Sequence, residues 1–195
     1  MIKIGITGNI ASGKSTFATF FNKKNTFIFN ADKEAKKHLK KHSVLQKKLV
    51  NSFGKKILIG RDLDFKKLAE ISFKNKINQK ILNGIVWPEI LILIEQAYKK
   101  AKKQKNDYFV VDAALLFEAN YQNFFDYIIL IISNKENRLK RAIKRKNMDI
   151  AQINKRMKLQ MPDKEKMKLS HFIIKNDSDI NYLEKKFQTI FKKLI

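Results

Sequence analysis

A short stretch after the first apolar run combines two glycines, a lysine and a serine at a spacing suited to binding phosphate. Gly8-Asn9-Ile10-Ala11-Ser12-Gly13-Lys14-Ser15 fits the pattern G-x-x-x-x-G-K-[ST], and it lies between an expected strand and an expected helix. The glycines allow successive backbone N–H groups to turn toward one anion, and the helix N-terminus adds partial positive charge. The alternative is an ordinary glycine-containing turn between a strand and a helix.

The residues of this loop have separate expected roles. Lys14 would reach the β- and γ-phosphates of ATP, and Ser15 would be a ligand of Mg²⁺. The remaining contacts to phosphate are expected from the loop and the first helical turn, at Gly8, Ala11, Ser12, Gly13 and Thr16. The loop thus predicts ATP with Mg²⁺ but does not identify the molecule that receives the phosphoryl group.

Two aspartates at the ends of apolar runs are candidates for the acceptor side and the metal side of such a reaction. Asp32 could accept a hydrogen bond from an acceptor hydroxyl, although a plain helix N-cap is the alternative. Asp112 is expected in the Mg²⁺ shell, through a water molecule, and the alternative is a turn-forming aspartate.

Three of the five arginines recur on one face of an expected helix. Arg138, Arg141 and Arg145 stand at i, i+3 and i+7, and the planar guanidinium fits phosphate oxygens well. We assign Arg141 to the catalytic group and Arg138 and Arg145 to the phosphate-binding group, although spacing alone does not decide which one contacts phosphate. A solvated basic face is the alternative.

Five short apolar runs alternate with helical segments along the chain. We expect buried strands at residues 2–6, 26–29, 108–111, 127–132 and 171–175, because each run is too short for a helix and too apolar for an exposed strand. The alternation predicts an α/β fold in which a five-stranded parallel sheet has helices on both faces. Ligands of such sheets bind at the carboxyl ends of the strands.

The helical segments divide the chain into a core and a long insertion. Residues 33–104 are lysine-rich and helical, and their best-defined helix is expected to follow Pro88, which would lie in its first turn. A helix over 134–146 should bury Leu139, Ala142 and Ile143. A last helix after Asp179 should bury one apolar face, formed by Ile180, Leu183, Phe187, Ile190, Phe191 and Leu194.

The charge of the chain is strongly positive. Its 195 residues include 42 Lys+Arg against 18 Asp+Glu, a formal net charge of +24, and such a field attracts polyanions. A basic nucleic-acid-binding NTPase is therefore an alternative. However, lysine is accompanied by frequent isoleucine and asparagine, and the AT-rich codons of all three are a sufficient explanation. We expect no specific nucleic-acid partner.

Further residue types exclude several classes of site. The chain has no cysteine, so disulfides and thiolate metal sites are excluded and a cytoplasmic location is the default. Apolar stretches such as 127–132 are far shorter than the roughly 20 residues of a membrane span, and no export segment is visible. His38, His42 and His171 show no metal-ligand spacing, which predicts surface or edge positions and no bound transition metal.

Several of these stretches, taken together, resemble the dephospho-CoA kinase family, whose members are small P-loop kinases related to the nucleoside monophosphate kinases. The resemblance covers almost the whole chain. Besides the phosphate-binding loop, the matching stretches are 30–32 (Asn-Ala-Asp), 60–64 (Gly-Arg-Asp-Leu-Asp), 112–118 (Asp-Ala-Ala-Leu-Leu-Phe-Glu), 138–145 with its arginines, Gln160 near 164–166, and 172–176 (Phe-Ile-Ile-Lys-Asn).

The resemblance implies an ATP-dependent phosphotransferase that phosphorylates the ribose 3′-hydroxyl of dephospho-CoA, which is the last step of coenzyme A biosynthesis. It implies a three-layer P-loop NTPase fold with a nucleotide-binding core at 1–32 and 105–195, a small lid at roughly 140–168, and a helical substrate-binding insertion at 33–104. Asp32 would position the hydroxyl, Glu118 and Trp87 would lie on the substrate side, and Asn176 would be near the adenine. Oligomeric state is not implied.

This chain departs from the family pattern at a few positions. Asn30 replaces an Asp, and Phe65 stands at the position after Leu63-Asp64 where the family often has an Arg. Trp87 replaces a His before Pro88, and Ala114 replaces a Pro. The runner-up function is another small-molecule P-loop kinase that acts on a nucleoside monophosphate or a sugar.

Overall fold

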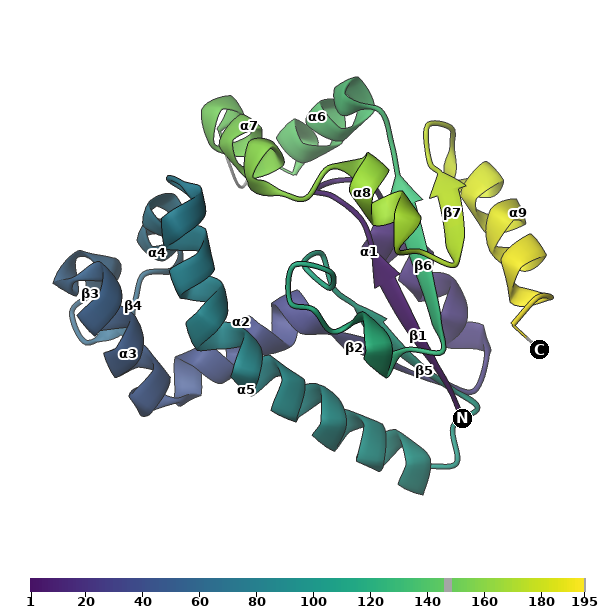
Figure 1. The fold of residues 1–195 in the computed structure, drawn as a ribbon, viewed down its shortest axis with the longest axis horizontal. Coiled ribbons are helices and arrows are strands. Elements are labelled where there is room, and N and C mark those ends of the chain that lie inside the picture. The colour runs from purple at the N-terminus through teal and green to yellow at the C-terminus, as the bar shows by residue number, and fades with distance from the viewer. Residues whose placement is uncertain (146–148, 195) are drawn as a thin grey trace.

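A twisted sheet of five parallel strands forms the centre of the protein (Figure 1). The computed structural model describes residues 1–145 and 149–194. The strand order is β2-β5-β1-β6-β7, and the strands are β1 (Ile2–Thr7), β2 (Thr26–Asn30), β5 (Tyr108–Asp112), β6 (Tyr127–Ile132) and β7 (Phe172–Lys175). All five predicted strands and the α/β class are confirmed, and β7 begins one residue later than expected.

Side chains along each central strand alternate between two apolar layers. In β1, Ile4 and Ile6 belong to one core, whereas a Cβ at Gly5 would contact Leu116 and Phe125 on the opposite face. Residues on both sheet faces are apolar because helices or loops cover both. Parallel pairing brings the ends of β1, β2 and β5 to one edge of the sheet, with Ile6 paired to Asp112.

The two faces of the sheet have different coverings. One core packs α1 (Lys14–Thr19) and α9 (Ile180–Phe191) against the sheet, through aromatic residues of these helices such as Phe17 and Phe187. The other core packs the long helix α5 (Lys76–Lys103) and the segment after β5, which includes η3 (Gln122–Phe124). The structure is therefore the expected three-layer arrangement.

The insertion has an apolar core of its own. After β2 the chain forms α2 (Ala31–Lys41), α3 (Ser43–Phe53), η2 (Lys55–Ile57), the short hairpin of β3 (Leu58–Ile59) and β4 (Asp62–Leu63), α4 (Phe65–Ser72) and then α5. The first half of α5 closes this core, whose buried members are Leu39, Leu45, Leu49, Phe53, Ile57, Leu63 and Leu68. Figure 1 shows these elements to one side of the sheet, with α5 running back toward it.

The prediction that a helix begins near Pro88 is wrong. Pro88 lies inside α5, which extends over 28 residues. Leu82 and Ile85 pack against the insertion core, and Ile90 and Ile94 pack against the sheet core. Tertiary contacts on both sides of the proline therefore outweigh its local cost of a missing backbone hydrogen bond.

Helix α5 is also long and apolar enough to cross a membrane by length and composition, which the sequence analysis did not foresee. Its most apolar 18-residue window has a mean hydropathy of 1.2, and 17% of that window is buried. Apolar residues of α5 contact two cores of the protein, although most residues of this window are not fully buried.

Three short helices follow β6. They are α6 (Lys135–Lys144), α7 (Ile150–Leu159) and α8 (Asp163–Lys168). The expected lid at 140–168 includes the end of α6 and all of α7 and α8. Residues 146–148 of the expected lid, and with them the predicted helix end at 146, lie outside the described residues. Ala142 and Leu139 pack with Ile153 and Ala11, but Ile143 is 41% exposed, contrary to expectation. The small cluster formed by α6 and α7 buries only a narrow stripe of α6. Ile180 at the start of α9 is likewise exposed.

Candidate active site

The loop between β1 and α1 has the backbone geometry that its glycines predict. Gly8 and Gly13 have φ values of 152° and 101°, and Ala11 between them has φ 59°. A Cβ at Gly13 would collide with the side chain of Asn176, and one at Gly8 would collide with the carbonyl oxygen of Ile131. Glycine is therefore required here both for the backbone angle and for the close approach of neighbouring strands.

Hydrogen bonds from distant parts of the chain hold this loop. The Asn176 side-chain amide donates to the Ser12 carbonyl (2.8 Å), and the Ile10 N–H donates to Oε1 of Gln160 (2.8 Å). The side-chain amide of Asn9 donates to the Asp163 carboxylate at the start of α8 (2.7 Å). The loop is thus tied to the end of β7 and to the segment between α7 and α8.

Lys14 lies between the two predicted carboxylates. Its Nζ is 3.7 Å from Oδ1 of Asp112 and 3.8 Å from Oδ2 of Asp32. The Lys14 and Asp112 side chains are 14% and 2% exposed, whereas that of Asp32 is 62% exposed. The three charged groups meet at the mouth of the loop, and Asp32 is the one open to solvent.

Asp112 is a buried carboxylate with incomplete hydrogen bonding. Its Oδ2 accepts from the Asn30 amide (2.7 Å), while its Oδ1 is buried and has no hydrogen-bond partner among the described residues. Burial raises the pKa of Asp112, and the Lys14 ammonium and the Ser15 hydroxyl oppose that shift. A buried carboxylate oxygen without a partner is costly in the absence of a ligand.

Asn30 has a second contact that defines the role of Asp32. Its side-chain Oδ1 accepts from the Lys33 N–H (2.9 Å), so Asn30 is the N-cap of α2. The alternative in which Asp32 caps the helix is therefore wrong. Asp32 lies in the first turn of α2 with its carboxylate directed toward Lys14.

The three arginines of α6 have different surroundings. Arg141 donates to the Asn176 carbonyl (3.0 Å) and to the Ser133 hydroxyl (3.3 Å), which joins the ends of β6 and β7. Arg138 has two buried guanidinium nitrogens with no partner in the part of the chain described. Arg145 is exposed at the C-terminal end of α6.

A cavity of about 380 Å³ adjoins the loop. The loop and α1 contribute Ala11, Gly13 and Thr16 to its lining, and α6 contributes Arg141, Lys144 and Arg145. Asn176 and residues between Ser178 and Leu183 also line it. The structure thus brings Ala11, Gly13, Thr16, Arg145 and Asn176 of the predicted phosphate-binding residues to one cavity, whereas Lys14, Ser15 and Arg138 do not line it.

Glu118 lies inside the protein rather than at the open mouth of the site. Its Oε1 is 3.1 Å from Nζ of Lys166 and accepts from the Met161 N–H (3.1 Å). Lys166 is fully buried and also donates to the Ala114 carbonyl (3.2 Å). Burial lowers the pKa of Lys166, and the Glu118 carboxylate opposes that shift. This pair joins α8 to the segment that follows β5.

Arg156 in α7 is a charged residue near Asp32 to which the sequence analysis gave no role. Its guanidinium carbon lies 4.5 Å from the centre of the Phe73 ring, after α4. Burial lowers the pKa of Arg156, and the Asp32 carboxylate opposes that shift. Gln152, one helical turn earlier, donates to Glu70 (3.2 Å). The i, i+4 spacing of these two residues was the available signal that they share a face.

Two remaining predictions concern residues of the insertion. Trp87 is partly buried and packs against the core between α5 and the sheet.

The prediction that the histidines lack metal-ligand spacing is wrong for two of them. His38, His42 and Glu89 place possible ligand atoms within 4.8 Å of one another. Separation by four residues puts both histidines on one face of a helix.

Comparison with known proteins agrees with these features. The family described as dephospho-CoA kinase matches residues 2–182. A dephospho-CoA kinase of Fusobacterium nucleatum is 38% identical over 187 residues, covering 95% of this chain and 94% of the relative. That of Carboxydothermus hydrogenoformans is 34% identical and covers 97% and 93%.

Solved structures extend the likeness to three dimensions. A dephospho-CoA kinase from Campylobacter jejuni superposes with a TM-score of 0.68 at 30% identity, covering 98% of this chain and 96% of that one. The structure of TT1252 from Thermus thermophilus superposes with a TM-score of 0.80 at 26% identity, covering 100% and 98%. With the glycine loop, the paired aspartates and the helical insertion in place, the sequence match over nearly the whole chain shows that this protein belongs to the dephospho-CoA kinase family.

Proposed function

We propose that this protein transfers the γ-phosphoryl group of ATP to the ribose 3′-hydroxyl of dephospho-CoA, giving coenzyme A and ADP. Family membership supports the reaction. The observation that supports these residues as its site is the position of Lys14 between Asp32 and Asp112 at the mouth of the loop. The Asp32 carboxylate is open to an acceptor. The Asp112 carboxylate is buried beside Ser15, which is expected to bind the metal.

The nucleotide would bind along the loop and into the adjoining cavity. The backbone N–H groups of Ala11 and of residues 13–16 would donate to its phosphates, because the Ser12 N–H already donates to the Asn9 carbonyl. Lys14 would neutralise the β- and γ-phosphates. The cavity beside Asn176 is the proposed adenine site. Two buried guanidinium nitrogens of Arg138, which have no hydrogen-bond partner among the described residues, would donate to phosphate oxygens.

Ser15 and Asp112 are the proposed residues for Mg²⁺. The fit rests on the buried Oδ1 of Asp112, which has no hydrogen-bond partner among the described residues, and on the oxygen ligands that Mg²⁺ prefers. Bound Mg²⁺ would neutralise charge on the β- and γ-phosphates. Because Mg²⁺ usually keeps several waters, Asp112 could act on it through one of them.

Asp32 is the proposed acceptor-side residue. Its exposed carboxylate would accept the hydrogen bond of the 3′-hydroxyl, align the oxygen with the γ-phosphorus and receive the proton as the new P–O bond forms. In a loose phosphoryl-transfer transition state, alignment and charge neutralisation supply most of the catalysis. Lys14 and the arginines would stabilise the transferring group.

The insertion and α7 are proposed to hold the rest of dephospho-CoA. They approach each other beside Asp32, where Arg156 stacks on Phe73 and Gln152 bonds to Glu70. Arg156 would provide positive charge for the pyrophosphate of the acceptor. Glu118 would support this side indirectly, by fixing the segment at Met161.

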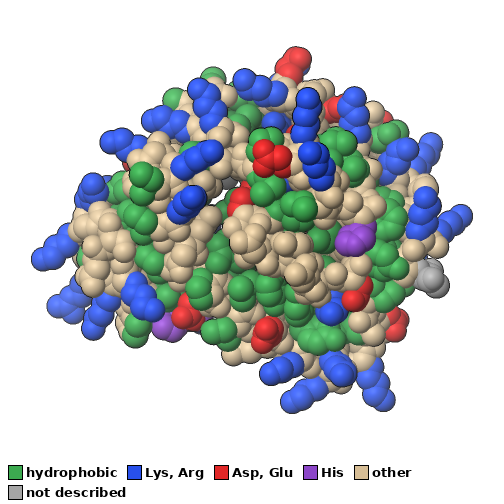
Figure 2. Space-filling model, in the orientation of Figure 1, with side chains coloured by type: hydrophobic (Ala, Val, Ile, Leu, Met, Phe, Trp, Pro, Cys, Tyr) green, Lys and Arg blue, Asp and Glu red, His purple; other side chains and the backbone are tan. Residues whose placement is uncertain are grey.

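The positive charge does not require a nucleic-acid partner. Figure 2 shows Lys and Arg side chains in several groups around the rim of the visible face rather than gathered into one stripe. A surface of dispersed lysines is typical of a solvated face. We propose that the enzyme acts in the cytoplasm, because it consumes ATP.

An acceptor panel tests this function. The purified protein is incubated with ATP, Mg²⁺ and either dephospho-CoA, AMP, or dephospho-CoA that lacks the 2′- or the 3′-hydroxyl, and products are identified by mass. We expect one added phosphoryl group on dephospho-CoA and on its 2′-deoxy form, and none on the 3′-deoxy form. Faster phosphorylation of AMP, or product from the 3′-deoxy analogue, would contradict the proposal.

A further inference from the structure

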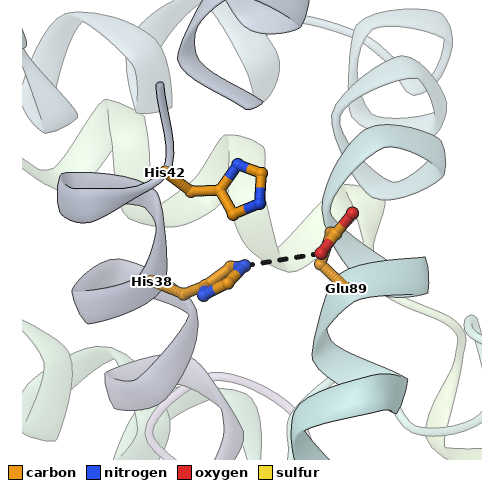
Figure 3. A group of neighbouring side chains, drawn as sticks. All are labelled: His38, His42 and Glu89. Carbon is orange, nitrogen blue, oxygen red and sulfur yellow. Dashed lines mark ion pairs between the residues drawn. The ribbon is translucent and has the colours of Figure 1, made fainter. Parts of the chain in front are cut away.

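Three side chains with metal-binding atoms meet in the insertion, away from the nucleotide site. His38 and His42 come from α2 and its C-terminal end, and Glu89 comes from α5 (Figure 3). One candidate ligand atom from each residue lies within 4.8 Å of the others. Nε2 of His38 is 3.4 Å from a carboxylate oxygen of Glu89, and the two imidazole rings are 4.8 Å apart between centroids.

The packing of two helices creates this cluster. Residues 38 and 42 are one helical turn apart, so both rings project from the same face of the chain. Helix α2 packs against α5, which brings Glu89 opposite them. His38 and Glu89 are 23% and 27% exposed, so the cluster is sheltered but remains within reach of an ion from solvent.

His38 lacks a good partner in this arrangement. Its Nε2 is buried and makes no hydrogen bond of acceptable geometry to any described residue. The contact with Glu89 is an ion pair only when the imidazole is protonated. Buried polar atoms without a hydrogen-bond partner are uncommon, and a bound ion is one arrangement that would satisfy this one.

We propose that His38, His42 and Glu89 bind one divalent transition-metal ion, with Zn²⁺ as the reference ion. Two imidazoles and one carboxylate are a common set of three zinc ligands, with water in the fourth position. Imidazole nitrogen also distinguishes such ions from Mg²⁺, which prefers oxygen. Ligand atoms around tetrahedral zinc lie about 3.3 Å apart, given bonds of about 2.0 Å. The three side chains close to that separation by rotamer adjustment.

Metal binding has a consequence for His42 that can be observed. Nδ1 of His42 accepts a hydrogen bond from the Leu45 N–H (3.3 Å), which caps α3. A neutral imidazole carries one proton, so this bond places the proton on Nε2. A metal at Nε2 moves the proton to Nδ1 and removes the acceptor. The Leu45 amide therefore loses its partner when the metal binds.

The site has a structural rather than a catalytic position. His38 is six residues beyond Asp32, which is about 9 Å along the axis of α2 at 1.5 Å per residue. The ion would join α2, whose first turn holds Asp32, to α5. This crosslink stabilises the insertion and restricts the helix that carries the acceptor-side carboxylate. It rests on the helix packing and does not depend on the proposed reaction.

Zinc titration of the metal-free full-length protein tests the site. ZnCl₂ is added without nucleotide and in millimolar MgCl₂, which occupies oxygen-ligand sites, and binding is measured by competition with a zinc indicator. We expect one equivalent to bind with micromolar or tighter affinity, and the unfolding temperature to rise. His38→Gln and Glu89→Gln should each weaken binding at least tenfold.

Two further variants separate metal binding from folding effects. His42→Asn removes a ligand but keeps a side chain that can cap α3, so it should lose zinc affinity and retain the fold. His171→Gln removes the third histidine of the chain, whose Nδ1 bonds to the Ile128 N–H far from the cluster, and should bind zinc like the wild type.

Nuclear magnetic resonance gives an independent readout. Zinc should shift the imidazole signals of His38 and His42 and the amide signal of Leu45, and leave the signals of His171 unchanged. The absence of one-equivalent binding, unchanged affinity in the His38 and Glu89 variants, or an equal loss in His171→Gln would each overturn the proposal.

Discussion

The loop end of the site, meaning the phosphate-binding loop at residues 8–15 and the residues that hold it, is stabilised by a different kind of contact from the helical insertion. At the loop end, side chains from two distant segments hold the loop by hydrogen bonds: Asn176 and Gln160 bond to its backbone, and Asp163 bonds to the Asn9 side chain. The insertion is held mainly by an apolar cluster around the fully buried Leu49. The loop end thus depends on directional hydrogen bonds, and the insertion depends on the burial of apolar side chains.

This difference indicates how the two halves would respond to change. Hydrogen bonds are directional, so a displaced donor is lost, whereas apolar contacts can rearrange at moderate cost. The loop end suits phosphate chemistry, which needs fixed donors, and the insertion suits a long and flexible acceptor. Contacts from α7 to Phe73 and Glu70 connect the two regions.

The largest effect is expected at the loop end, for Lys14→Met. Loss of the ammonium group that would face the transferring phosphoryl should lower kcat by about a thousandfold, the size seen for comparable charge-stabilising groups. The measurement is steady-state turnover with ATP and dephospho-CoA. Lys23→Met, at an exposed lysine after α1, is the control and should retain wild-type turnover. Near-normal turnover of Lys14→Met would remove the loop from the reaction.

A smaller effect at the same end is expected for Arg138→Met. Its two guanidinium nitrogens that have no partner in the described part of the chain would donate to phosphate. The variant loses these bonds, so kcat/KM for ATP should fall by about tenfold to a hundredfold, as for hydrogen bonds to charged groups. Stability without ligand should stay equal or rise, because a buried unpaired charge is removed. Lys140→Met, on the exposed side of α6, is the control. A destabilised variant with normal kcat/KM would mean that Arg138 is purely structural.

Leu49→Ala should affect the other region selectively. A cavity in the insertion core costs about 3 kcal/mol of stability, and the loosened insertion should raise KM for dephospho-CoA by about tenfold. The dissociation constant of MgATP should stay the same, because the loop has separate supports. Val44→Ala, at an exposed position of the same helix, is the control. Equal weakening of both substrates would show that the regions are not independent.

The smallest effect concerns pH. Asp112 must be ionised to assist Mg²⁺, so activity is lost as the pH falls through its pKa. Because burial raises that pKa, the acid limb of kcat/KM should lie above the ordinary value of 3.8. Protonation relieves the buried charge, so the contribution of Asp112 to stability increases as the pH falls. Circular dichroism over the same range checks that folding is retained, and an acid limb at or below 3.8 would contradict the assignment.

Features set by short-range pattern could be predicted from the sequence. The five strands follow from apolar runs, and the geometry of the loop follows from Gly8 and Gly13. Asp32 and Asp112 were predicted near the loop because parallel strands end at one edge of the sheet, and both lie beside Lys14.

Features set by tertiary partners could not be predicted. Pro88 lies within a helix because two separate cores hold both halves of α5. Glu118 is directed inward by Lys166, from a segment 48 residues later in the sequence. Arg141, expected as a catalytic group, also donates to the Asn176 carbonyl after β7, a contact that its spacing in α6 does not predict. Each outcome depends on which segments meet in space, and spacing along the chain does not contain that information.

The division of roles between Lys14 and Asp32 is tested most directly by Asp32→Asn. The measurement pairs calorimetric titration of MgATP with the rate of a single turnover on bound dephospho-CoA. We predict that MgATP binds as tightly as to the wild type or more so, because Lys14 loses a competing carboxylate, while the single-turnover rate falls by at least about a hundredfold. Weaker MgATP binding with an unchanged rate would contradict the assignment of Asp32 to the acceptor.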